Sequence, residues 1–309
     1  MSIFESKNQK TIMIEKAIKA SLILAAAISI LTTFGILFSI LFEAIEFFQL
    51  RSFWYFLTGT VWSPGVIGSQ FGALPIFAGT FMITLIALLV AIPVGLGSAI
   101  YMSEYASDKV RDYLKPILEI LAGIPTVVYG FFAAITVAPL IVKAADAVGL
   151  EATFNSALAS GLVMGIMIIP VISSLSDDVI RSVPDSQRKA AFGLGMTQGE
   201  VIKNIVLPSA LPGIISASLL GLSKALGETM IVVMAAGLRP NLSFNPLEDM
   251  TTVTVTVVNS LVGDFEFNSP ETLSAFALGL VLFVITLILN MISLSLIRKF
   301  KEKYKINTL

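Results

Sequence analysis

The sequence predicts an all-α integral membrane protein with six transmembrane helices. Only 13% of the 309 residues are charged, the mean hydropathy is +0.89, and the apolar residues form long runs without a charge. Soluble domains carry about 25% charged residues. The chain therefore has too little charge to solvate an ordinary surface, and lipid is the expected solvent for most of it.

The predicted helices follow from the uncharged runs, because a spanning helix needs about 20 apolar residues at a rise of about 1.5 Å each. Runs of 23 to 26 uncharged residues separate Lys19 from Glu43, Glu119 from Lys143, Glu151 from Asp177, and Glu271 from Arg298. The stretch 52–103 is longer than one crossing and begins with aromatic residues, so we assign its first half to an interfacial loop. The predicted helices are about 19–43, 75–103, 117–142, 153–176, 208–238 and 272–297.

The placement of Lys and Arg predicts the topology. Sixteen of the 20 basic residues lie in the N-terminal tail (1–18) and its junction with the first helix, the 104–118 loop, the 177–207 loop and the end of the chain, including the tail 301–309. The opposite side has only Arg51, Lys143 and Arg239. By the positive-inside rule, both termini are expected in the cytoplasm, on either side of a membrane domain at 19–300.

The composition also excludes several kinds of chemistry. With no Cys and no His, the chain has no thiol nucleophile, no thiolate or imidazole metal ligand and no histidine base. A net charge of −1 gives no basic footprint for nucleic acid. We expect no catalytic residue, no metal site, no cofactor and no nucleic-acid partner. Since the sequence contains no Gly-x-x-x-x-Gly-Lys-Ser/Thr loop, any ATP hydrolysis must come from another subunit.

Glycine and proline interrupt the predicted third helix at Gly123-Ile124-Pro125. Membrane helices use such residues for close packing, and packing alone accounts for most of the glycines and prolines in this chain. The alternative is a helix break at mid-membrane whose freed backbone groups line a pathway. The sequence leaves both interpretations open.

Lys224 and Glu228 are the two charged residues inside the predicted helix 208–238. Each would cost about 2.5–3.5 kcal/mol at the centre of a membrane helix. With a spacing of four residues, both side chains are expected on one face of that helix. They form either a structural ion pair or part of a polar path in which Lys224 offers a positive charge to a passing anion.

The segment 177–207 is too long for a simple turn between two helices. Asp185 is a plausible N-cap and Gly193 and Gly195 supply a turn, which predicts a helix-turn-helix held against the next membrane helix by Leu207-Pro208. Ala190 and Ala191 keep one of its surfaces flat. Such a unit is suited to transmitting force to a partner in the cytoplasm.

The spacing of this segment resembles the Glu-Ala-Ala loop of ABC-type import permeases, which contact the ATPase through it. Six positions agree with that pattern: Ala190, Ala191, Gly195, Ile205, Leu207 and Pro208. Lys189 stands where the family has glutamate, and Gly199 stands where a bulkier residue is common. The resemblance implies that the residues coupled to the ATPase are Lys189, Ala190, Ala191, Gly195, Met196, Glu200, Leu207 and Pro208.

The resemblance extends over nearly the whole chain to the PstC-type permeases of phosphate ABC importers. The runs that carry it include Ile92–Gly97, Ile100–Tyr105, Leu121–Phe131 and Lys224–Met230. It implies a type I importer permease of MetI-like architecture in the bacterial inner membrane. The partners would be a PstA-type second permease, two copies of a PstB-type ATPase and a PstS-type periplasmic phosphate-binding protein. Residues implied in the substrate pathway are Lys224, where the family usually has arginine, with Glu228, Thr126 and Tyr129.

Two alternatives and one undecided segment remain. The same permease class could carry another tetrahedral anion, such as molybdate or sulfate, and a carrier independent of ATP is a more distant alternative. The predicted outer loop 239–271 is acidic, which fits delivery of the anion by a docked protein better than capture from bulk solution. Within it, Thr251 to Val258 is β-branched throughout and fits either a strand or a short helix packed across the outer mouth.

Overall fold

The structure is a computed structural model that describes residues 2–65, 68–262 and 266–303. The all-α prediction is confirmed, and six helical stretches in this part of the chain are long and apolar enough to cross a membrane. They are Thr11–Leu50, Leu74–Tyr105, Thr126–Ala147, Ala157–Arg181, Gln198–Leu226 and Pro270–Ser295. Most of the predicted C-terminal tail 301–309 and the acidic residue Asp264 lie outside the described residues.

Helices α3 (Leu74–Ile100) and α7 (Ala157–Arg181) pack against each other at the centre of the bundle. Glycines bring them close: a Cβ on Gly161 would lie 2.7 Å from the side chain of Ile86, and one on Gly165 would lie 2.9 Å from the carbonyl of Ala87. Helix α10 (Leu207–Leu226) packs on α7 in the same way, through Gly213 and Gly221. Small residues at helix contacts are the usual means of packing in lipid, where no hydrophobic force drives helices together.

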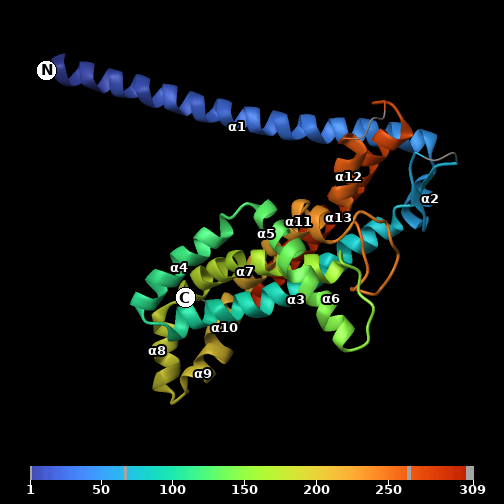
Figure 1. Cartoon of the computed structure of the whole chain (residues 1–309). Helices are drawn as coiled ribbons and strands as arrows, with labels where there is room; N and C mark the ends of the chain where they lie inside the picture. Colours follow the sequence, from blue (N-terminus) through green and yellow to red (C-terminus); the bar gives the residue numbers. More distant parts are fainter. Residues whose placement is uncertain (1, 66–67, 263–265, 304–309) are drawn as a thin grey trace.

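Helix α1 (Ser2–Leu50) extends away from the bundle (Figure 1). From Thr11 to Phe34 its residues are exposed, and its buried contacts begin at Ala44 and Phe47. There it packs against α13 (Pro270–Lys303) and an aromatic cluster. The exposed apolar side chains between Met13 and Phe34 can face lipid or another subunit.

The segment assigned to an interfacial loop has secondary structure of its own. It contains the short helix α2 (Phe53–Thr58) and an antiparallel pair of strands, β1 (Trp62–Ser63) and β2 (Gln70–Phe71), with Trp62 opposite Phe71. Phe56, Trp62 and Phe71 bury their rings edge to face with one another and with the end of α1. The aromatic residues therefore form a small core. We call the end of the molecule that contains this core the outer end.

The predicted helix 117–142 is wrong across residues 123–125. Helix α4 (Asp108–Ala122) ends at Gly123, and the span Thr126–Ala147 begins after the break as α5 (Thr126–Phe132), which continues through η2 (Ala133–Val137) and α6 (Ala138–Ala147). Pro125 explains the break, because it has no N–H and disfavours helical backbone at the residue before it. The helix break is therefore present, at the start of the span Thr126–Ala147, and a pathway lined by its backbone groups stays a prediction.

The predicted helix 208–238 is also wrong, because α10 ends at Leu226 and a separate helix α11 (Met230–Ala235) follows. Gly227 occupies the C-cap of α10, and Gly237, with a φ of +98°, ends the second piece. Lys224 and Glu228 therefore do not belong to one helix. The expectation that they face each other one turn apart is wrong for the same reason.

The β-branched segment of the outer loop is helical and not a strand. Helix α12 (Val253–Val262) packs along α13 and buries Val253, Val255 and Thr256. The hydroxyl of Thr80 in α3 accepts a hydrogen bond from the Val253 amide at 3.0 Å. Tertiary contacts here override a low intrinsic helix propensity.

We predict that Gly79→Ala destabilises the chain and that Gly97→Ala, on the same helix, does not. A Cβ on Gly79 would lie 2.1 Å from the carbonyl oxygen of Thr251, whereas one on Gly97 has nothing within 4 Å. Overpacking typically costs about 1–3 kcal/mol. The check is the thermal unfolding midpoint in detergent: a lowered midpoint for Gly79→Ala and an unchanged or raised one for Gly97→Ala. Equal midpoints would contradict the packing of α12 described here.

Candidate functional site

The segment with the Glu-Ala-Ala spacing forms two short helices joined by a turn, at the end of the molecule opposite α2 (Figure 1). Helix α8 (Asp185–Gly193) begins after Pro184, so Pro184 and not Asp185 occupies the N-cap. Gly195 has a φ of +83°, a left-handed conformation that favours glycine. Thr197 and Glu200 then form a capping box that starts α9 (Gln198–Val201), which continues through η3 (Ile202–Val206) into α10.

One side of this coupling segment, residues 185–206, is packed and the other is free. Ala191 is buried, and Met196 packs against the same apolar cluster. Leu207 also packs against that cluster, at the start of α10, beside the half-buried Pro208. The opposite side exposes Lys189, Ala190 and Glu200 together with two apolar side chains, Phe192 and Leu194, the latter 81% exposed. An exposed apolar pair next to a flat alanine surface is suited to docking a protein partner.

Ion pairs attach the neighbouring helices to this end of the molecule. Asp177, fully buried on α7, accepts a hydrogen bond from Arg111 of α4 at 2.7 Å, and this bond raises the pKa of the arginine. Lys115 of α4 pairs with Asp178. Arg188 of α8 pairs with Glu104 in the π-helical turn η1 (Tyr101–Tyr105) at 2.9 Å. Sequence reasoning used the basic residues for topology but predicted none of these ion pairs, since no local pattern indicates which acid each basic residue meets.

Glu228 lies at the break between α10 and α11. Its side chain is 7% exposed, and Oε1 accepts hydrogen bonds from the amides of Met230 at 3.0 Å and Ile231 at 3.3 Å. Its backbone carbonyl accepts a hydrogen bond from the Thr254 hydroxyl at 2.8 Å. The carboxylate thus satisfies amides at the start of α11 that have no partner within the helix.

Lys224 lies in the last turn of α10, where the negative end of the helix dipole favours a cation. It is half-buried, and within the described ranges no carboxylate lies within ion-pair distance of its ammonium. Because Glu228 is bound to backbone amides, the structural ion pair between the two is absent from the described structure. Among the described residues, Lys224 therefore has no ion-pair partner at its place in the last turn of α10.

Thr126 and Tyr129 lie on α5, and α5 packs against α11. A Cβ on Gly130 would lie 3.1 Å from the carbonyl of Met230, the first residue of α11. The first residue of α11 therefore lies about one helical turn along α5 from Thr126, the first residue of α5. Thr126 is half-buried, whereas Tyr129 is buried and donates its hydroxyl hydrogen to the carbonyl of Leu121 across the first break, at 2.9 Å.

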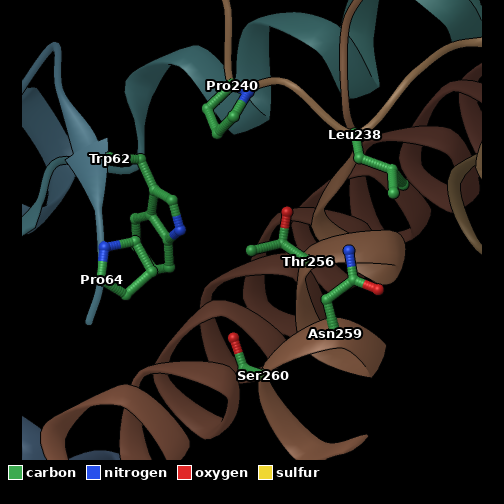
Figure 2. Close-up of a pocket in the computed structure, with 7 residues that line it drawn as sticks. All are labelled: Trp62, Pro64, Leu238, Pro240, Thr256, Asn259 and Ser260. Atoms are coloured by element: carbon green, nitrogen blue, oxygen red, sulfur yellow. The ribbon is translucent and has the colours of Figure 1, made fainter. Parts of the chain in front are cut away.

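A cavity of about 280 Å³ opens at the outer end. Figure 2 shows Trp62 and Pro64 on one side of it and Thr256, Asn259 and Ser260 of α12 on the other, below Leu238 and Pro240. Glu248 orders the loop that precedes α12, because its carboxylate accepts hydrogen bonds from the side-chain amides of Asn241 and Asn245. These bonds lower the pKa of its carboxyl. The acidic loop is thus a folded structure beside the cavity.

Residues 91–303 match the family described as "Binding-protein-dependent transport system inner membrane component". The matched region covers more than half of the chain and contains the coupling segment and both helix breaks. The chain belongs to this family.

Named members of this family are similar over most of their length. The Phosphate transport system permease protein PstC of Mesorhizobium japonicum is 35% identical over 287 residues, covering 86% of this chain and 84% of that protein. PstC 1 of Mycobacterium tuberculosis is 34% identical over 276 residues, with 79% and 82% covered. The Probable ABC transporter permease protein YqgH of Bacillus subtilis is 33% identical over 251 residues, with 81% and 78% covered. The resemblance to PstC-type permeases is therefore confirmed.

Chains of solved bacterial ABC transporters share the fold. A chain of the bacterial alginate ABC transporter, solved with an alginate-bound periplasmic protein, aligns with a TM-score of 0.57 at 15% identity and covers 90% of this chain and 94% of its own. A chain of the inward-facing MetNI methionine transporter gives 0.53 at 16% identity, covering 74% and 94%. At these identities the likeness establishes the fold alone, and this fold is the predicted MetI-like permease architecture. The family match and the six apolar helices indicate an inner membrane protein with several spanning helices.

Proposed function

We propose that this chain is a permease subunit of an ATP-driven phosphate importer and forms half of its membrane pathway. The single observation that carries the site assignment is Lys224, a half-buried cation in a spanning helix whose sequence neighbour Glu228 is bound to other groups. A fixed positive charge without a counter-ion favours entry of an anion into a low-dielectric path. The named PstC relatives support phosphate as that anion.

The two adjacent helix breaks support the location of the path. Discontinuous helices in transporters place free backbone groups at the substrate. In this chain the breaks at 123–125 and 227–229 precede two helices that pack together, with Thr126 at the start of one and Glu228 before the other. Tyr129 contributes to the path wall by bridging the first break. Lys224 would attract the anion, and the residues at the breaks would shape its route.

The coupling segment supports a separate ATPase as the source of energy. Its exposed side presents Lys189, Ala190, Phe192, Leu194 and Gly195 to solvent. One such surface engages one ATPase subunit, and ATPases of this class work in pairs. The proposed complex thus contains a second permease of PstA type, two ATPase subunits of PstB type and a phosphate-binding protein of PstS type at the outer end. In this assembly both termini and the coupling segment face the cytoplasm, as the distribution of basic residues predicts.

We predict that Lys224→Ala abolishes phosphate uptake and that Lys224→Arg retains it, because only the charge is essential to the proposed path. The measurement is uptake of radiolabelled phosphate by vesicles that contain the complete complex. Lys143→Ala is the matched control, since Lys143 is an exposed lysine in α6. Normal uptake by Lys224→Ala in an assembled complex would refute the role of this residue.

We predict that Gly195→Asp uncouples ATP hydrolysis from transport. The substitution places a side chain at a φ of +83° and a charge on the docking side, which would misplace α9 relative to α8. Gly193→Asp is the control, because Gly193 is helical and a Cβ there has nothing within 4 Å. Uptake per ATP hydrolysed should fall at least tenfold in the first variant only. An unchanged ratio would contradict the assignment of the coupling segment.

A further inference from the structure

Glu104, at the end of the second spanning helix, receives hydrogen bonds from both helices of the coupling segment. Its carboxylate Oε1 accepts from Arg188 Nη2 of α8 at 2.9 Å. Its backbone carbonyl accepts from Gln198 Nε2 of α9 at 2.7 Å. The turn between α8 and α9 is therefore fixed to one residue of η1 from both sides.

The same arginine also reaches the end of the fourth spanning helix. Arg188 Nη2 donates to the carbonyl of Ile180 at 2.9 Å, and Nη1 donates to the carbonyl of Val183. The last carbonyls of α7 have no partner within the helix, so a cation that donates to them is well placed. One guanidinium thus connects α8 with the ends of α3–η1 and α7, the two central helices of the bundle. We call Glu104, Arg188, Gln198 and the carbonyls of Ile180 and Val183 the Glu104 cluster.

Burial separates this cluster from an ordinary surface ion pair. The side chain of Arg188 is 14% exposed and that of Glu104 is 9% exposed. The nearby pair Arg181–Asp108 is 3.7 Å apart with 40% and 89% exposed, in the range where ion pairs contribute little. Removing one partner of a largely buried pair leaves a charge without compensation, which is strongly destabilising locally.

The position of Glu104 in a π-helical turn adds a second observation. In η1, between Tyr101 and Tyr105, the helix is widened by an extra residue, and the Ala106 amide donates to the carbonyl of Tyr101. Such turns are rare and occur often at functional sites. Here the widened turn ends the second spanning helix at the residue that accepts from both α8 and α9.

We infer that Arg188 and Glu104 are positioning residues that transmit displacement of the coupling segment to α3 and α7 together. This inference rests on the proposed function, in which an ATPase moves that segment. Neither residue touches the substrate or ATP. They make the coupling segment move as one body with the ends of α3–η1 and α7 that carry Glu104 and Ile180. Without them the coupling segment would move alone.

The test uses the complete complex in vesicles, with and without the binding protein loaded with inorganic phosphate. We expect Arg188→Ala and Glu104→Ala each to lower the ratio of stimulated to basal ATPase activity at least tenfold, measured on the assembled complex with the loaded binding protein. The double variant should lose no more than either single variant, because the two residues act as one unit. Backbone amides of 185–201 should exchange hydrogen at least tenfold faster in Arg188→Ala.

Arg181→Ala is the matched control, since it removes an arginine of an exposed ion pair from the same end of the molecule. Arg188→Lys guards against a variant that fails to fold, and it should restore part of the stimulation. Unchanged stimulation and exchange in the two alanine variants would overturn the inference, as would failed assembly in both Arg188→Ala and Arg188→Lys. If the unaltered complex shows neither phosphate uptake nor stimulation by phosphate, the proposed function fails instead.

Discussion

The constraint on which this structure depends is that every backbone polar group in hydrocarbon needs a hydrogen-bond partner inside the protein. The spans Thr126–Ala147 and Gln198–Leu226 nevertheless each end at a helix break, at 123–125 and 227–229, and each break has a local solution. Tyr129 donates to a carbonyl at the end of α4, and Glu228 accepts from two amides at the start of α11. Because Glu228 is hydrogen-bonded to backbone amides, it does not pair with Lys224. The hydrogen bonds that stabilise the break thus leave the lysine available for the proposed path.

Ion pairs hold together the end of the molecule that carries the coupling segment. Three arginine or lysine residues, on α4 and α8, meet carboxylates at the ends of α3–η1 and α7. The central helices themselves touch through glycine, alanine and branched side chains, which hold distance and orientation but offer no polar attachment. Ion pairs at the edge of the apolar region therefore connect the bundle to the segment that is proposed to receive force. The centre of the bundle is therefore held by apolar packing, and the end that carries the coupling segment is held by ion pairs.

Sequence reasoning predicted what composition and long patterns decide. The six spans follow from length and hydropathy, and the helix-turn-helix at 185–206 follows from the glycine and alanine spacing. It failed where a single residue interrupts a long, mostly apolar run: Pro125 ends one predicted helix and Gly227 ends another. The role of Lys224 and Glu228 in a substrate path stays a prediction. The ion pair that was one of the two alternatives is absent from the described residues, since a spacing of four residues has meaning only on a continuous helix.

Contacts between distant parts of the chain could not be predicted. Glu104 and Arg188 are 84 residues apart, and nothing in either neighbourhood indicates the other. The helical state of α12 also depends on its neighbours, because its β-branched sequence alone fits a strand equally well. Contacts of this kind can be recognised only when the three-dimensional fold is known. They involve residues that connect one helix to another, and not residues that determine where a helix forms.

The most direct test of the central claim is anion uptake by vesicles that contain this chain with its second permease and ATPase subunits. Phosphate, sulfate and molybdate would be supplied in turn, each with and without ATP and with the binding protein present outside. The account predicts uptake of phosphate that requires both ATP and the binding protein, with little uptake of the other two anions. Uptake that proceeds without ATPase subunits, or that prefers sulfate or molybdate, would contradict it.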